Sequence, residues 1–103
     1  MDLFLSRPDE IVKLLGERLR KERLAQHKTQ AEIAARSGVG VNTVSNLEAG
    51  RNVVFESVVR VAMVLGRLKD LEQLFLPKLD SLGDIQRYED SSQRLRVRKR
   101  ADA

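Results

Sequence analysis

One predicted helix, residues 41–49, presents short amides and hydroxyls on its outer face. Surface helices usually carry Glu, Lys and Arg, because Asn, Thr and Ser are weaker helix formers. Amide side chains form paired hydrogen bonds with a flat polar edge such as that of adenine, and a threonine methyl packs against that of thymine. The pattern therefore suggests that these side chains have a use other than stabilising the helix. The side chains concerned are Asn42, Thr43, Ser45 and Asn46.

The helix that carries these side chains is the second of a pair. Thr29 and Glu32 have the spacing of a capping box, so a first helix is expected to begin directly after Thr29. Gly38 suits the left-handed conformation that ends a helix, and Gly40 can act as the next N-cap. Gly50 ends the second helix. The residues predicted to face inward are Ile33, Ala34 and Ser37 in the first helix and Val44 and Leu47 in the second.

This pair of helices resembles the helix-turn-helix of the Xre/Cro family of DNA-binding regulators. The resemblance extends from about Leu15 to Phe75 and implies an all-α, five-helix, lambda-repressor-like domain. The alternative is a helical hairpin that binds nothing, which several spaced matches make the weaker interpretation. The matches are Gln30 at the first motif position, Ala34 where the helices cross, Gly38 in the turn, and Val44 and Leu47 in the core of the recognition helix.

The resemblance implies different tasks for the polar side chains. Contacts with base edges specify a sequence, whereas contacts with phosphates position the protein. Gln30, at a helix N-terminus, is expected to bond a phosphate. Val41 offers only apolar contact with a thymine methyl. The residues expected at base edges are Val41, Asn42, Thr43 and Asn46, and those expected at the DNA backbone are Gln30, Ser45, Arg51 and Asn52.

Arg23 and Glu48 are the predicted internal ion pair. Ile11, Leu15 and Leu19 recur every four residues in the first helix, and Arg23 continues this stripe where an apolar residue would be expected. Related regulators carry an arginine at this position, and it pairs with a glutamate near the end of the recognition helix, which corresponds to Glu48. The resemblance therefore implies an ion pair. The alternative is an exposed Arg23 without a partner.

The composition argues against several function classes. The chain has 103 residues, which fits one domain, and contains no cysteine and one histidine. It offers no disulfide framework, few of the ligands typical of metal sites, and no Cys–His pair for nucleophilic catalysis. No apolar run approaches the roughly 20 residues that cross a bilayer, and residues 1–10 do not resemble a signal peptide. We therefore expect a cytoplasmic protein without membrane contact that is not an enzyme and needs neither cofactor nor metal.

The positive charge is concentrated in two places. The net charge is +4, yet residues 1–93 hold fourteen basic and fourteen acidic side chains. Residues 13–51 hold eight basic and four acidic side chains, and a basic tail follows residue 93. Such a distribution is typical of nucleic-acid binders, the alternative being a solvated surface. The tail, predicted either to contact DNA phosphates or to pair as a strand with another chain, comprises Arg94, Arg96, Arg98, Lys99 and Arg100.

Three more helices complete the predicted domain. The first uses Ser6 as N-cap with Pro8 in its first turn, and it ends near residue 26, where His27 is expected to be the C-cap in the left-handed conformation. The fourth helix follows the loop after Gly50, and the fifth stops before Pro77. Their predicted inward residues are Phe55, Val58, Ala62 and Leu65 in the fourth, with Val59 and Val61 additional, and Leu68, Leu71 and Phe75 in the fifth.

The predicted domain boundaries are 1–8, 9–76 and 77–103. The lead Met1–Leu5 is apolar and is interpreted as a strand, a staple under the first helix or a dimer contact. Within the C-terminal extension, Ser81–Glu89 predicts a short amphipathic helix that packs on its own core or forms a dimer interface. A polar linker is predicted over Glu89–Gln93, and Arg94–Arg98 alternates like a strand.

The predicted function is sequence-specific binding of double-stranded DNA by a homodimer, as a repressor of a palindromic operator. Xre-like chains with a short basic extension also resemble HipB-like antitoxins, which bind a protein toxin as well as their operator. That second hypothesis stays open, because the extension is compatible with it. A pure protein-interaction module is disfavoured by the outer face of amides and hydroxyls in residues 41–49.

Overall fold

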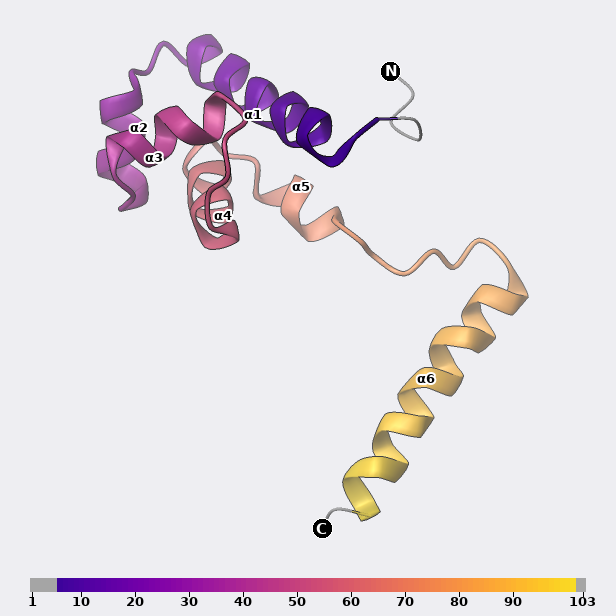
Figure 1. Ribbon diagram of the computed structural model, residues 1–103. Coiled ribbons are helices and arrows are strands. Elements are labelled where there is room, and N and C mark those ends of the chain that lie inside the picture. Colours follow the sequence, from indigo (N-terminus) through magenta and orange to yellow (C-terminus); the bar gives the residue numbers. More distant parts are fainter. Residues whose placement is uncertain (1–5, 102–103) are drawn as a thin grey trace. The chain divides into compact units, whose positions relative to one another are not determined.

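The computed structural model describes residues 6–101, with side chains described as far as residue 96. The lead Met1–Leu5 therefore lies outside the described residues. All secondary structure in the described range is helical, as predicted (Figure 1). The chain divides into two compact units, Met1–Glu72 and Gln73–Ala103. The helices are α1 (Pro8–Ala25), α2 (Gln30–Ser37), α3 (Val41–Glu48), α4 (Phe55–Val64), α5 (Leu68–Gln73) and α6 (Leu82–Ala101).

The start of α1 differs from the prediction, whereas its end agrees with it. Arg7, not Ser6, is the N-cap residue, and no side chain bonds to this helix end. The reason is Pro8, because a proline at the first helical position forces the residue before it into extended backbone. Arg7 has φ −80° and ψ 156° accordingly. The helix stops near residue 26 as predicted, but its C-cap is Gln26 and not His27, which follows it with φ 56°, the left-handed conformation that was expected.

The turn between α2 and α3 has the predicted local structure. Glu32 N donates to Thr29 Oγ1 and Thr29 N donates to Glu32 Oε1, each over 3.1 Å, which completes the capping box. Gly38 ends α2 with φ 76°, and Gly40 is the extended N-cap of α3. Residues with side chains rarely adopt so positive a φ, so Gly38 lets the chain reverse within a few residues.

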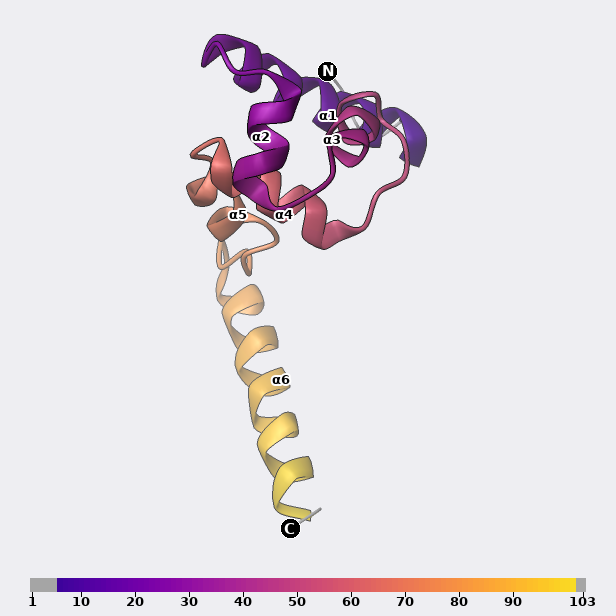
Figure 2. The same ribbon diagram turned by 90° about the vertical axis from the view of Figure 1, so that its left-hand side faces the viewer.

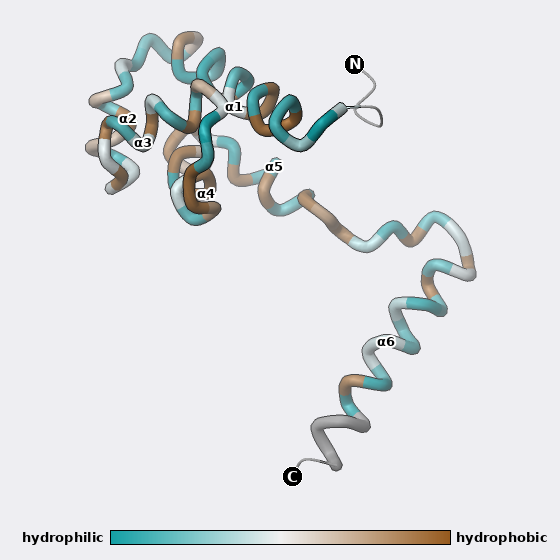
Figure 3. Tube along the Cα trace, viewed as in Figure 1, coloured by the Kyte–Doolittle hydropathy of each residue, from teal (hydrophilic) through white to brown (hydrophobic). Residues whose placement is uncertain are grey.

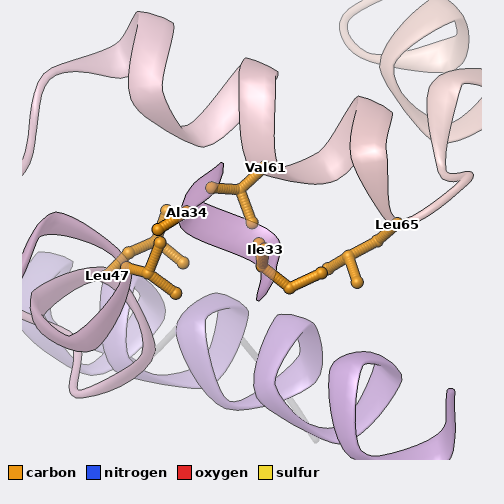
Figure 4. Packing of buried hydrophobic residues seen from close by; sticks show 6 residues of the cluster. Ile33, Ala34, Leu47, Val61 and Leu65 are labelled. Carbon is orange, nitrogen blue, oxygen red and sulfur yellow. The ribbon is translucent and has the colours of Figure 1, made fainter. Parts of the chain in front are cut away.

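The core of the first unit lies where α2, α3 and α4 meet (Figures 2 and 4). Ile33, Val44 and Val61 have no exposed surface. In Figure 3 most of α4 is brown, that is apolar, as its sequence of mainly aliphatic residues requires. The inward positions predicted for α2 and α3 are confirmed. The buried cluster comprises Ile33, Ala34, Val44, Leu47, Val61 and Leu65.

Four apolar side chains predicted to face the core are exposed instead, and Leu15 of α1, 48% exposed, is the first of them. Phe55 is the first residue of α4 and is 66% exposed, while the additional position Val61 is fully buried. Leu68 is 46% exposed. Phe75 is 92% exposed, because α5 ends at Gln73 and not near residue 76. Phe75 lies past that end with φ 54°, so it loses the helical spacing on which its prediction rested.

The C-terminal unit contains one continuous helix, which corrects two predictions. Ser81 Oγ accepts from Asp84 N over 3.2 Å at its start, and α6 then continues to Ala101. The predicted linker Glu89–Gln93 and the strand-like Arg94–Arg98 are both helical. After Gly83 no glycine or proline interrupts the sequence, and Arg, Leu, Gln, Glu and Lys are good helix formers. Once begun, a helix extends at little cost per residue.

Candidate nucleic-acid interface

Helix α3 has one buried side and one accessible side. Val44 and Leu47 belong to the core, and Glu48 beside them is only 5% exposed. The inward packing sets the rotation of the helix about its axis, so the remaining positions must face outward. Every residue predicted to contact bases keeps accessible surface. Val41 and Asn42 are exposed, and Thr43 and Asn46 are half-buried, as is Ser45, which was predicted to contact the DNA backbone.

Asn46 is bound to the loop that follows α3. Arg51 Nη1 donates to Asn46 Oδ1 over 3.1 Å, and Arg51 N donates to the carbonyl oxygen of Asn46 over 2.9 Å. The amide oxygen of Asn46 is therefore occupied in the free protein. Paired recognition of adenine uses both the oxygen and the NH₂ group of an asparagine. An amide oxygen can accept two hydrogen bonds, so Asn46 keeps one acceptor position and its NH₂ group for a base while Arg51 stays bound.

Gln30 is also held by α3. It is the first residue of α2, and its Nε2 donates to Glu48 Oε1 over 3.0 Å. This contact points the amide toward the recognition helix in the free protein. An amide nitrogen carries two N–H groups, so one donor is left for another acceptor. The phosphate contact predicted for Gln30 remains a prediction, and Glu48 sets the position from which it would be made.

The carboxylate of Glu48 joins three helices. Arg23 Nε and Nη2 donate to its two oxygens over 2.7 and 3.0 Å, in the two-pronged geometry that favours Arg–carboxylate pairs. Their side chains are 9% and 3% exposed. Arg23 Nη1 also donates to the carbonyl oxygen of Lys28 over 2.8 Å. The hydrogen bond to Glu48 raises the pKa of Arg23, against the opposing effect of burial.

This network fixes α3 relative to α1 and α2. Within the described residues, no buried side-chain nitrogen or oxygen lacks a hydrogen-bond partner. Buried polar groups that are fully partnered hold one arrangement, because any shift would leave a group without its bond. The predicted contact between Arg23 and Glu48 is thus present, with Gln30 as a third member that the sequence did not predict.

Gly16 allows the close approach of α1 to α3. A Cβ atom at this position would lie 2.2 Å from the carbonyl oxygen of Leu47 and 3.3 Å from that of Glu48. No side chain larger than a hydrogen fits there without moving one of the helices. Sequence reasoning overlooked Gly16. The available signal was a glycine inside the apolar stripe of a helix, where it costs stability unless packing requires it.

The loop after α3 begins against Lys13 of α1. Gly50 has φ 78°, and a Cβ atom on it would lie 2.7 Å from Cα of Lys13. The first turns of α1 therefore lie against the beginning of the loop Arg51–Asn52. Arg51, Asn52 and Lys13 are all exposed. Sequence reasoning had not assigned Lys13 to the site, because it belongs to a different helix.

The basic tail lies on α6. Arg94 and Arg96 are exposed, whereas the side chains of Arg98, Lys99 and Arg100 lie outside the described residues. The backbone of all five belongs to the helix. Their charges therefore follow a helical backbone and not the strand that was predicted.

The sequence profile described as "Helix-turn-helix domain" matches residues 14–74, more than half of the chain. The chain belongs to this helix-turn-helix family. The matched range contains α2, the turn and α3, together with Gly16, Arg23 and Glu48. Among curated proteins, sequence comparison finds no match.

The helix-turn-helix protein is a DNA-binding regulator of the Xre type, with the all-α fold that was predicted. In such a motif the second helix lies in the major groove, and that helix is α3 here. None of the helices in the described part of the chain is long and apolar enough to cross a membrane.

Proposed function

We propose that this helix-turn-helix protein is a repressor that binds a palindromic operator as a homodimer. The observation that carries the proposal is the accessible side of α3, where amides and hydroxyls are presented on a helix held by the buried Arg23–Glu48 pair. A rigid helix lets short side chains reach base edges, because they have little length with which to correct a misplaced backbone.

The proposed contacts divide between bases and backbone. Asn42, Thr43 and Asn46 would form hydrogen bonds with base edges, and Val41 would pack against a thymine methyl. Gln30 and the loop Arg51–Asn52 would hold phosphates, with Ser45 between the two groups. Lys13 joins this set because of its position beside Gly50.

The proposed activity is binding alone. A protein that occupies a promoter excludes other proteins from the same DNA, and this needs no bond-breaking step, cofactor or metal. A palindromic operator follows from a two-fold dimer, in which each recognition helix reads one half-site about 34 Å from the other. A cytoplasmic location is part of the same proposal.

Selection of bound DNA from a random pool tests the proposal. The full chain should enrich one sequence with inverted symmetry. Asn42→Asp places a negative charge on the accessible side of α3 and should abolish enrichment, because DNA phosphates repel it. Gln73→Glu changes net charge equally at an exposed site on α5 and should enrich the same sequence as the unaltered chain. Enrichment of no sequence by the unaltered protein would refute base-specific recognition.

The second candidate function is that of an antitoxin, which would bind a protein toxin as well as its operator. The observation in its favour is α6, whose apolar side chains Leu82 and Leu95 are 71% and 55% exposed. Purification under native conditions provides the test. A second protein that co-purifies in fixed proportion, and is lost when residues 82–103 are deleted, would favour this candidate.

A further inference from the structure

Helix α6 has an apolar stripe without a partner in its own unit. From Leu82 to Arg96 every described residue is exposed except Asp84, which is half-buried. Ile85, Tyr88 and Leu95 are 44%, 38% and 55% exposed. Together with Ser92 they are spaced by three, four and three residues, which is the spacing of the a and d positions of a coiled coil. Most of a helix's stability in proteins comes from packing of its apolar face, so such a stripe calls for a partner helix.

The two halves of α6 carry opposite charge. Residues 82–93 hold three acidic side chains and one basic side chain, a net charge of −2. Residues 94–101 hold five basic side chains and no acidic one, a net charge of +5. This polarity identifies a fitting partner, because opposite charges attract across an interface and like charges opposite each other are costly. The acidic residues are Asp84, Glu89 and Asp90.

We propose that α6 pairs in antiparallel orientation with α6 of a second copy of the chain. Antiparallel pairing sets the basic end of each helix beside the start of the other helix, which holds Asp84, whereas parallel pairing sets the two basic ends together. One register satisfies the apolar stripe as well. With Ile85 opposite Leu95 of the second copy, Tyr88 comes opposite Ser92, so a large ring meets a small hydroxyl. In the same register Asp84 comes level with Arg96.

The pairing specifies how the proposed homodimer would form. Its role in DNA binding depends on the proposed function. In this register the two Leu82 residues are 16 positions apart along the helix axis, or about 24 Å at 1.5 Å per residue. The half-sites of a palindrome lie about 34 Å apart. Residues 74–81 connect each α6 to its helix-turn-helix unit and can cover the remaining distance. Parallel pairing would instead bring both helix starts within about one helix diameter, roughly 10 Å.

Cysteine cross-linking of the full chain tests the orientation, because the natural sequence contains no cysteine. An equal mixture of Ile85→Cys and Leu95→Cys chains should form a disulfide-linked dimer under mild oxidation, since a disulfide needs Cα atoms only about 4.4–6.8 Å apart. Neither variant alone should cross-link. Gln86→Cys mixed with Leu95→Cys is the matched control and should cross-link far less, because residue 86 lies outside the stripe.

Sedimentation of the same preparations completes the test. The unaltered chain should be a dimer at low salt, and Ile85→Glu should weaken dimerisation at least about tenfold, because it buries an unpaired charge. Gln86→Glu should leave dimerisation within about twofold of the unaltered chain, since surface changes have small effects. Cross-linking of either single variant with itself would establish a parallel pair and overturn the proposal. A monomeric chain, or an α6 that binds only a foreign protein, would overturn it too.

The failures of pairing and of DNA recognition are distinguishable. If the random-pool selection yields a palindrome but the mixed cysteine variants do not cross-link, the antiparallel pairing is wrong and the proposed function stands. If they cross-link but no DNA sequence is enriched, the pairing stands and the proposed function is wrong.

Discussion

The helix-turn-helix unit and the C-terminal unit are both helical, but among the described residues only the first unit buries an arginine. In the first unit Arg23 is buried and bonds a carboxylate and a backbone carbonyl. In the second, Arg94 and Arg96 are exposed on α6. A buried arginine needs fixed partners, whereas an exposed one keeps its charge available for a ligand. The comparison shows that similar arginines on helices serve as an internal tie or as surface charge according to what packs around them.

Removal of Arg23 should have the largest effect. Arg23→Ala leaves the Glu48 carboxylate buried without its main partner, at a cost of about 3–5 kcal/mol in the free energy of unfolding. Arg20→Ala is the control on the same helix, because Arg20 forms an exposed pair with Glu17 and its loss should cost at most about 1 kcal/mol. Urea unfolding measures both.

The double variant Arg23→Ala/Glu48→Ala should be less damaged than the sum of its single changes. Additive losses would show that the two side chains act independently. The difference between buried and exposed arginines would then have no energetic basis in this protein.

A glycine in each unit provides the next contrast. Gly16→Ala should destabilise the first unit by about 1–3 kcal/mol, because the added methyl meets the carbonyl oxygen of Leu47. Gly83→Ala, near the start of α6, meets only Ser81 Oγ at an ordinary 3.8 Å. That change should raise the helix content seen by circular dichroism, since alanine favours a helix by about 1 kcal/mol. An unchanged unfolding midpoint for Gly16→Ala would mean that α1 is not held against α3.

Base contacts and backbone contacts can be separated by two variants on DNA. Asn46→Ala should lose about 1–3 kcal/mol of binding free energy on the preferred sequence and relax the choice of one base pair. Arg51→Ala should weaken all sequences alike and make the slope of log affinity against log salt shallower by about 0.9. Titrations on preferred and random DNA at several salt concentrations provide the measurement. Equal losses of Asn46→Ala on both kinds of DNA would contradict its role in base recognition.

The smallest effect concerns the capping box. The backbone N–H of Thr29 donates to the Glu32 carboxylate, and this bond, with a smaller contribution from the Thr29 side chain, lowers the pKa of Glu32. A carboxyl group with a lowered pKa stabilises the folded state fully above its unfolded pKa, about 4.3. That contribution is lost as the pH falls through the folded pKa. NMR titration should place the Glu32 pKa below this reference, and Glu32→Gln should reduce the acid sensitivity of α2. A titration at or above the reference value would contradict the bond.

The local features of the first unit were readable from the sequence. The capping box at Thr29, the turn at Gly38 and the inward positions Val44 and Leu47 depend on neighbours within a few residues, so residue type and spacing were enough. The predictions were wrong where such rules were applied at the end of a helix. Ser6 is not the N-cap, because Pro8 fixes the residue directly before it in that position, and Phe75 is not buried, because α5 ends at Gln73.

The sequence by itself determined the helical class, the helix-turn-helix and the concentration of positive charge after residue 93, because these follow from composition and short-range spacing. Only the tertiary structure showed that Gly16 lets the backbone of Leu47 approach α1, that Gln30 donates to Glu48, and that Lys13 lies beside Gly50. Each of these contacts joins residues 18 to 37 positions apart in the sequence, where spacing carries no information about distance. They depend on how helices pack against one another, and packing is settled by the whole set of facing side chains.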